Sequence, residues 1–342
     1  MSLPAVSSEA LELLSASEVV DAHIESFVWS RVFGYDVNAR HGRGPLGGWL
    51  FSQSDVPRMI EAGMTGGVFS IATNPFRRRR RRRDTLVRNV NRLRAALESS
   101  PRVAVVKGIG GYRQARADGK LACFLAVQGG NAIDGPDDLT SIPDDVISRI
   151  TLVHLSRSPL GSSSAPGGWG PSGLTDLGRA CVKAMNDRRI IVDLAHISRS
   201  GFWDALSVHD RSQPAIVSHT GVCAVHDSWR NVDDDQIKAI ADTGGVVGIM
   251  FHTGFLGESL WAGRAEAVVR HVEHVIRVGG EGAVAIGSDW DGLIVPPVDL
   301  RTVSDFPLLV QLMLDRGLSP STVQKALGAN YLRVVEQVRP AL

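Results

Sequence analysis

Residues 190–196 read Ile-Ile-Val-Asp-Leu-Ala-His, so an apolar, β-branched run passes directly into an aspartate and, three residues later, a histidine. A continuous apolar run of this length is typical of a strand covered on both faces, as in a parallel sheet. The polar residues, Asp193 and His196, come at the carboxyl end of the run. This order predicts an α/β fold whose functional side chains follow the strands.

Seven more apolar runs recur along the chain, separated by segments of helical length. They lie at residues 19–23, 67–71, 124–127, 150–153, 215–217, 246–251 and 283–286. Helix signals between them are a cap at Thr175, a cap at Asp233 or Asp234, helical spacing over residues 267–276 and a periodic run after Ser321. Eight strands alternating with helices predict an α/β chain folded as a (β/α)8 TIM-like barrel. An open doubly wound sheet is the alternative.

The length and composition of the chain fit one large domain. Its 342 residues exceed the usual single-domain length, but eight βα units with insertions need about 250 residues or more. Hydrophobic residues make up 44% of the chain, which is enough for a sizeable core. We expect a single domain over residues 1–342, with the barrel core at about residues 19–338.

Charge and cysteine usage restrict the partners and the compartment. The chain has 37 basic and 36 acidic residues, a net charge of +1, which argues against a protein that binds polyanions. Its three cysteines are widely spaced and match neither a disulfide framework nor a metal motif. The first residues lack a secretion signal, and no stretch approaches the ~18 apolar residues of a membrane span. We expect a cytoplasmic location with no membrane and no nucleic-acid partner.

Two segments depart from the globular average. Residues 77–83 are seven consecutive arginines, for which we expect a solvated loop or a first helical turn. A nucleic-acid or anionic-surface patch is the alternative, although no aromatic residue interleaves the run. Residues 156–173 are rich in Ser, Gly and Pro and follow a predicted strand. They are expected to form either a flap over the barrel mouth or a plain connecting loop.

Polar side chains stand at the carboxyl ends of the predicted strands. They are His23 with Glu25, Gln128, His154, His196, His219 and Asp289. Active sites of barrels lie at that end and draw on several strands. Histidine and carboxylate groups are suitable ligands for Zn²⁺, which would lower the pKa of a bound water and polarise a carbonyl group. We therefore expect a metal-dependent hydrolase, with Asp289 accepting a proton from the water and returning it to the leaving group.

Structural roles compete with this interpretation at each position. A lone histidine at a strand end is more often a hydrogen-bonded structural residue than a ligand, but four such positions together favour a site. His271 and His274 share one amphipathic helix, and we expect surface or packing roles for them. His252 follows a predicted strand and is a candidate for lining the pocket, whereas Cys123 is expected in the core. The chain has no G-x-S-x-G elbow, and residues 108–111 are too short for a nucleotide-binding fingerprint.

Several longer motifs resemble the membrane (renal-type) dipeptidase family of metallopeptidases, within the amidohydrolase-like superfamily. The resemblance runs from about Val19 to Val338. It is strongest at residues 173–178, 193–196, 218–219, 230–232, 287–292 and 328–334. It implies a binuclear zinc centre that hydrolyses dipeptides, some with unusual stereochemistry at the C-terminal residue.

The resemblance also implies roles for individual residues. His23 corresponds to a ligand of the first metal ion, and His196 and His219 to ligands of the second. His154 and Arg230 correspond to substrate-binding positions, where the planar fork of Arg230 suits a free carboxylate. Asp289 corresponds to the acid of strand eight, expected to transfer protons or to bind the substrate amine.

Two positions depart from the family pattern. The first motif is His-x-Asp in the family, whereas this chain has His23-Ile24-Glu25. The family's bridging glutamate is replaced by Gln128. A neutral amide cannot readily bridge two dications or offset their repulsion, so we predict one or two zinc ions, with the second site weakened or absent. In a mononuclear centre Asp289 would itself become a ligand beside His23, His196 or His219.

Three functions remain open at this point. The leading one is hydrolysis of a dipeptide or a similar small amide. The second keeps the barrel and the metal but acts on another acyl-amino acid or a lactone. The third, favoured by Gln128, is a metal-poor relative that binds a small ligand. A homodimer is compatible with the sequence, and a nucleic-acid role for residues 77–83 is the most distant alternative.

Overall fold

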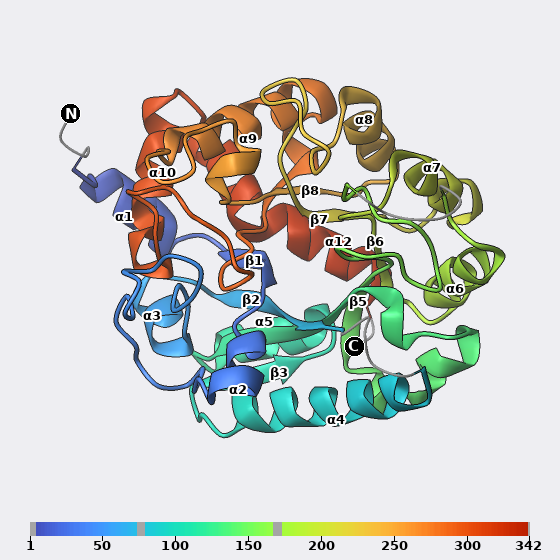
Figure 1. Ribbon diagram of the computed structural model, residues 1–342. Coiled ribbons are helices and arrows are strands. Elements are labelled where there is room, and N and C mark those ends of the chain that lie inside the picture. The colour runs from blue at the N-terminus through green and yellow to red at the C-terminus, as the bar shows by residue number, and fades with distance from the viewer. Residues whose placement is uncertain (1–4, 74–78, 167–172, 341–342) are drawn as a thin grey trace.

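The computed structural model describes residues 5–73, 79–166 and 173–340 and has an α/β architecture with parallel strands (Figure 1). One sheet has the order β1 (Val20–Ile24), β2 (Gly66–Ala72), β4 (Leu121–Gln128), β5 (Ile147–Thr151), β6 (Ile191–Asp193). A second sheet has the order β7 (Val217–Thr220), β8 (Val247–Ile249), β9 (Val284–Ile286). Each of the eight predicted runs overlaps one of these strands. The strands are buried along their lengths, as the continuous apolar runs predict.

A ninth strand, β3 (Val103–Val106), was not among the predicted runs. It pairs in parallel with the first half of β4, from Val103 opposite Leu121 to Val106 opposite Phe124. Strand β5 pairs with the second half of the same edge, from Leu125 onward. The missed strand is a short run between charged segments, and only its position against β4 distinguishes it from a loop.

The two sheets contact each other at both edges. An isolated parallel bridge joins Asp193 to Ile216, where the amide of Leu194 donates to the carbonyl of Ile216 at 2.8 Å. A second parallel bridge joins Ile24 to Trp290, where the amide of Glu25 donates to the carbonyl of Trp290 at 2.9 Å. The chain thus forms a curled parallel arrangement. The carboxyl ends of β1, β4, β6, β7 and β9 lie on the same side of it.

Helices surround the strands (Figure 1). Their bounds are α1 (Ser8–Ser15), α2 (Phe27–Phe33), α3 (Val56–Glu61), α4 (Arg79–Glu98), α5 (Ile109–Ala117), α6 (Asp176–Asp187), α7 (Arg199–Val208), α8 (Asp234–Asp242), α9 (Glu266–Gly279), α10 (Phe306–Asp315), α11 (Pro320–Gln324) and α12 (Asn330–Val338). No helix of the described residues is long and apolar enough to cross a membrane.

The predicted helix signals are confirmed. Thr175 caps α6 by accepting a hydrogen bond from the amide of Gly178. Asp233, rather than Asp234, caps α8 and forms a capping box with Gln236. Near the C-terminus, a π-helical turn over Lys325–Ala329 connects α11 to α12.

The two unusual segments are partly described. Helix α4 begins within the arginine run, so residues 79–83 form a first helical turn, and residues 77 and 78 lie outside the described part. Arg82 donates to the carbonyl of Asn131 at 3.3 Å, and Arg83 pairs with Asp138 at 3.3 Å. In the Ser/Gly/Pro segment, Ser163 forms an antiparallel bridge with Ile197, beside the site described below. Residues 167–172 lie outside the described part, so the flap or plain connecting loop expected over residues 156–173 stays a prediction.

His271 and His274 are packing residues rather than surface residues. Both are buried in α9, at 0% and 3% exposure. The Nδ1 atom of His271 accepts from the amide of Val222 at 2.9 Å, so its ring must be neutral. Burial lowers the pKa of His271 to about 4.

This buried ring predicts a loss of stability in acid. The folded pKa of His271 is below its unfolded value, so its contribution is complete above pH 6.5 and is lost as the pH falls towards 4. The difference in unfolding free energy between the wild type and His271→Gln should therefore shrink by roughly 3 kcal/mol over this window. Urea denaturation of both proteins between pH 7 and pH 4, in the presence of a chelator, measures this difference in unfolding free energy. A difference that stays constant from pH 7 to pH 4 would contradict the prediction.

Candidate metal centre

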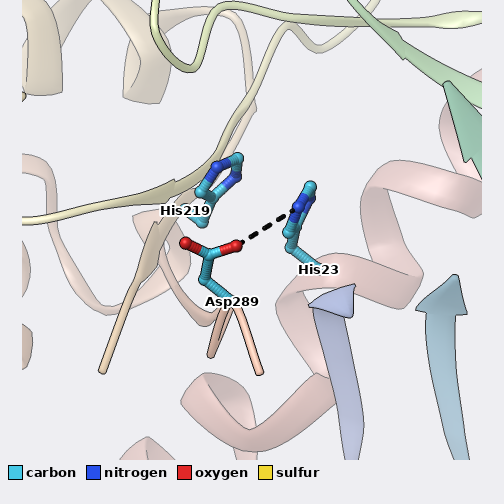
Figure 2. A group of neighbouring side chains, drawn as sticks. All are labelled: His23, His219 and Asp289. Atoms are coloured by element: carbon cyan, nitrogen blue, oxygen red, sulfur yellow. Dashed lines mark ion pairs between the residues drawn. The ribbon is translucent and has the colours of Figure 1, made fainter. Parts of the chain in front are cut away.

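The predicted site residues converge at the carboxyl ends of the strands. His23 lies in β1, and His219 lies in β7, with both rings fully buried. Asp289 follows β9 and is 7% exposed. One ligand atom from each of the three lies within 4.8 Å of the others (Figure 2). The rings of His23 and His219 stack with centroids 3.8 Å apart.

The carboxylates face the outer edge of the His23 ring. Its Nε2 atom lies 3.5 Å from Oε1 of Glu25 and 3.6 Å from Oδ1 of Asp289. Burial raises the pKa of Glu25 to about 7, and burial together with the Glu25 charge raises the pKa of Asp289 well above its usual range. Burial therefore makes both carboxylates costly as anions, and the charges of Arg31 and Arg149 offset this cost only in part at Glu25.

His219 is oriented by a hydrogen-bonded chain behind it. The hydroxyl of Ser218 donates to Oδ2 of Asp193 at 2.7 Å and lies 2.8 Å from Nδ1 of His219. A hydroxyl has a single proton, so Ser218 must accept from Nδ1–H of His219. The Nε2 atom of His219 consequently carries a free lone pair toward the site, as a metal-ligating histidine requires.

His196 lies directly opposite this lone pair. Its Nε2 atom is 2.8 Å from Nε2 of His219 and 3.1 Å from Nη2 of Arg230, which can only donate. When Nε2 of His196 accepts from Arg230, two nitrogen lone pairs face each other at hydrogen-bond distance. Such a contact is unfavourable unless a proton or a metal ion lies between the two nitrogens.

Gln128 ends β4 beside His196. Its Nε2 atom is 3.5 Å from Nε2 of His196, and its Oε1 atom is buried without a hydrogen-bond partner among the described residues. The neutral amide contributes no charge there. The outcome is a cluster with two carboxylates near His23 and none between His196 and His219.

Burial favours the neutral form of three histidines at the site. Burial lowers the pKa of His23, His196 and His219 well below the usual value. The next largest causes are the charges of Arg149 for His23 and Arg230 for His196. Neutral imidazole is the form that binds metal ions.

Backbone strain is concentrated at the same place. Three residues here have a left-handed backbone conformation, which residues other than glycine rarely adopt. They are His196, Asp289 and Asp291, with φ values of +64°, +63° and +67°. Each costs about 1–3 kcal/mol and persists because the surroundings fix it. Gly287 precedes this loop because a Cβ atom there would lie 1.8 Å from the carbonyl oxygen of Ser218. The strained conformations direct two predicted site residues into the cluster.

A cavity of about 340 Å³ opens onto the cluster. Its polar lining includes Glu25, Arg31, Thr73, His154, His196, Arg230, His252 and Asp289. The remaining walls are largely apolar, from Val28, Leu155, Trp229, Met250, Phe255, Leu293 and Ile294. The ring of His154 meets that of His196 edge-on at 4.7 Å, and burial lowers the pKa of His154 to about 4. His252 lines the pocket, as expected.

Arg230 is 4% exposed, and its guanidinium donates to the carbonyl of His219 at 2.7 Å. Burial lowers its pKa only to about 10, so it remains a cation at the cavity wall. An anionic ligand group is the natural partner of such a cation.

One central residue was missed from the sequence. Arg149 is 0% exposed, pairs with Asp193 and donates to Nδ1 of His23 at 3.0 Å. It lies just before the predicted run at residues 150–153, where an arginine is usually interpreted as a solvated flank. The sequence did contain one signal: Arg149 and Thr151 are two residues apart, so their side chains lie on the same side of strand β5.

The residues present fit a divalent ion. The buried Nε2 of His23, Oε1 of Glu25 and Oε1 of Gln128 lack hydrogen-bond partners among the described residues, and the His196–His219 contact calls for a cation. Neutral imidazole and carboxylate donors together suit Zn²⁺ or a similar borderline ion.

Comparison with known proteins identifies relatives of this chain. A family model described as membrane dipeptidase (peptidase family M19) matches residues 7–341. Among solved structures, the dipeptidase AC, a metallopeptidase of family M19, is 26% identical, with 95% of this chain and 99% of that chain covered and a TM-score of 0.84. A metallopeptidase from Rhodobacter sphaeroides, liganded with a phosphinate mimic of the dipeptide L-Ala-D-Ala, is 25% identical, with 94% and 99% covered and a TM-score of 0.83. An amidohydrolase from Pseudomonas aeruginosa, at 22% identity, 96% and 98% coverage and a TM-score of 0.78, shares the fold.

Proposed function

This chain belongs to the membrane dipeptidase family of metallopeptidases, and we propose that it cleaves the amide bond of a dipeptide at the cluster of His23, His219 and Asp289. The observation that carries the proposal is the convergence of neutral imidazoles and carboxylates at one cavity with a buried arginine in its wall. We propose Zn²⁺ as the ion, held by His219 together with donors drawn from the candidates His196, His23, Glu25, Gln128 and Asp289. When bound, the ion supplies Lewis-acid chemistry that activates water and polarises a carbonyl group.

Side chains of the protein bind the substrate and transfer the proton. Arg230 binds the C-terminal carboxylate of the dipeptide through its guanidinium, which stays charged inside the cavity. His154 lines the same cavity and, as a neutral imidazole, can donate to the substrate carbonyl. Asp289 holds the proton released by water at its carboxylate and passes it to the leaving amine. The apolar walls accommodate dipeptides with apolar side chains and exclude water.

A panel of dipeptides tests this function. It should include apolar dipeptides with an L or a D residue at the C-terminus, because a relative binds a mimic of L-Ala-D-Ala. We expect release of free amino acids that stops with a chelator and returns with zinc. Acyl-amino acids and lactones in the same panel test the second substrate class. No hydrolysis of any dipeptide by zinc-loaded, folded protein would refute the proposal.

Arg230 should determine recognition of the free carboxylate. Arg230→Met is expected to lower kcat/KM for dipeptides by about 10- to 100-fold, mainly through KM, because hydrogen bonds to charged groups contribute about 1.5–3 kcal/mol. Dipeptides with an amidated C-terminus are the control, since they lack the carboxylate. The wild type should discriminate against them and the variant should not. Equal discrimination by both proteins would show that another group binds the carboxylate.

A second candidate function follows from Gln128. A site without a carboxylate between His196 and His219 could bind a small ligand without hydrolysing it. Gln128→Glu distinguishes the two candidates. If the natural protein is inactive and the change creates metal binding and peptidase activity, the binding function is favoured. If the natural protein is active and the change adds little, the binding function fails.

We also propose that the two sheets form a single closed (β/α)8 barrel. The parallel bridges Asp193–Ile216 and Ile24–Trp290 support it, because they join β6 to β7 and the loop after β9 to β1. Closure in this order uses the eight predicted strands and leaves β3 outside the ring.

A further inference from the structure

Arg149 is a buried cation directly behind His23. Its guanidinium pairs with Asp193 and lies within hydrogen-bond distance of five further acceptor groups, which share the N–H protons of Nη1 and Nη2, so its position is fixed from several strands. Those groups are Nδ1 of His23 at 3.0 Å, the hydroxyls of Ser70, Thr151 and Ser218 at 3.0, 3.0 and 3.1 Å, and the carbonyl of Ala22 at 3.3 Å.

This contact determines which nitrogen of His23 carries the proton. A guanidinium has donors and no acceptor, so Nδ1 of His23 must accept. The hydroxyl of Ser70 lies 3.3 Å from the same nitrogen and already accepts from Arg149, which leaves its own proton free to donate to Nδ1. A neutral imidazole that accepts at Nδ1 carries its proton on Nε2. That Nε2–H faces the oxygens of Glu25 and Asp289.

His219 has the opposite arrangement. Ser218 gives its only proton to Asp193, so Nδ1 of His219 donates to Ser218 and Nε2 keeps its lone pair. The stacked rings of His23 and His219 therefore carry different tautomers. One nitrogen is prepared to bind a metal ion, and the other is blocked by a proton.

We propose that the centre holds a single divalent ion at His196 and His219, and that Arg149 prevents a second ion from binding at His23. This inference rests on the proposed function only in taking the cluster as a metal site. Arg149 acts by fixing the proton on Nε2 of His23, so that this nitrogen has no lone pair for an ion. His23 is then not a ligand, and its N–H faces the carboxylates of Glu25 and Asp289 at 3.5 and 3.6 Å.

The tautomers can be measured without altering Arg149. Histidine-specific ¹⁵N labelling of the zinc-loaded wild type, with long-range ¹H–¹⁵N correlation spectra, distinguishes Nδ1–H from Nε2–H rings. The signals lost in His23→Gln and His219→Asn assign the two residues. We expect an Nε2–H ring for His23 and an Nδ1–H ring for His219. A His23 ring protonated on Nδ1, with Nε2 bound to the ion, would overturn the proposal.

Metal content provides the second test. We expect one tightly bound zinc ion per chain in the wild type and in Gln128→Glu, and two in the double variant Gln128→Glu/Arg149→Gln, in which the amide can accept from Nδ1–H of His23. Gln128→Glu/Arg149→Lys retains a donor cation and should stay at one ion. Two ions in the wild type or in Gln128→Glu alone would overturn the proposal, as would one ion in a folded Gln128→Glu/Arg149→Gln.

The double variant is expected to fold. Asp193 keeps four other donors, namely the amides of Ala195 and Ser218 and the hydroxyls of Thr151 and Ser218. Thermal unfolding monitored by circular dichroism confirms folding before ions are counted. Neither measurement depends on hydrolysis. A protein with one ion, the expected tautomers and no dipeptidase activity would refute the proposed function alone, whereas an active protein with two ions would refute this inference alone.

Discussion

Replacing His219 with asparagine is expected to abolish tight zinc binding and to lower kcat/KM for dipeptides by at least about 10²–10³-fold, the loss typical of removing one preorganised stabilising group. The reason is that His219 contacts the other histidines of the site. Its Nε2 lone pair faces His196, its ring stacks on His23, and Ser218 and Asp193 fix its tautomer. Metal analysis after dialysis and steady-state kinetics measure the two effects.

A loss of folding must be distinguished from a loss of metal. Zinc at 100 times its Kd should stabilise the wild type by about 2.7 kcal/mol and leave His219→Asn unaffected, while both proteins unfold alike in a chelator. His226→Asn is the matched control, since this ring lies outside the cluster and the cavity. A His219→Asn protein that still binds zinc with wild-type affinity would contradict the assignment.

Asp289→Asn is expected to lower kcat by about 10²–10⁴-fold with a small change in KM, which is the usual contribution of a general acid–base group. An amide of the same shape preserves the loop but cannot hold the proton released by water. Its oxygen lies at the site, 3.6 Å from Nε2 of His23, and its backbone conformation directs it there. The pH dependence of kcat provides an independent measurement, because one limb of the profile should disappear in the variant.

Asp291→Asn is the matched control for this change. Asp291 lies in the same loop with a similar φ, but its carboxylate accepts hydrogen bonds from Ser26 and from the amides of Gln53 and Ser54. We expect this variant to lose about 1.5–3 kcal/mol of stability while the folded fraction keeps its kcat. The opposite pattern, with a lower rate for Asp291→Asn and full activity for Asp289→Asn, would move the proton-transfer role away from Asp289.

The strands and the convergence of the candidate site residues could be predicted because both leave local signals. An apolar run buried on two faces is visible in the sequence, and the eight runs each overlap an observed strand. Polar residues directly after such runs must lie at one edge of a parallel arrangement, so His23, His219 and Asp289 could be brought together before any coordinates. The caps of α6 and α8 are likewise local, since an N-cap bonds within its own first turn.

What the sequence by itself determined, then, is the α/β class, the strands and the set of side chains at their carboxyl ends, because these follow from patterns within a few residues. Only the tertiary structure decided how the site is charged and protonated. Strand β3 is defined by its pairing with β4, and Arg149 by contacts with residues up to 127 positions away in the chain. An arginine beside an apolar run gives no local sign that it will be enclosed by Asp193, Ser218 and His23. Hydrogen-bond direction depends on which donors and acceptors meet in space, and that meeting fixes the different roles of His23 and His219.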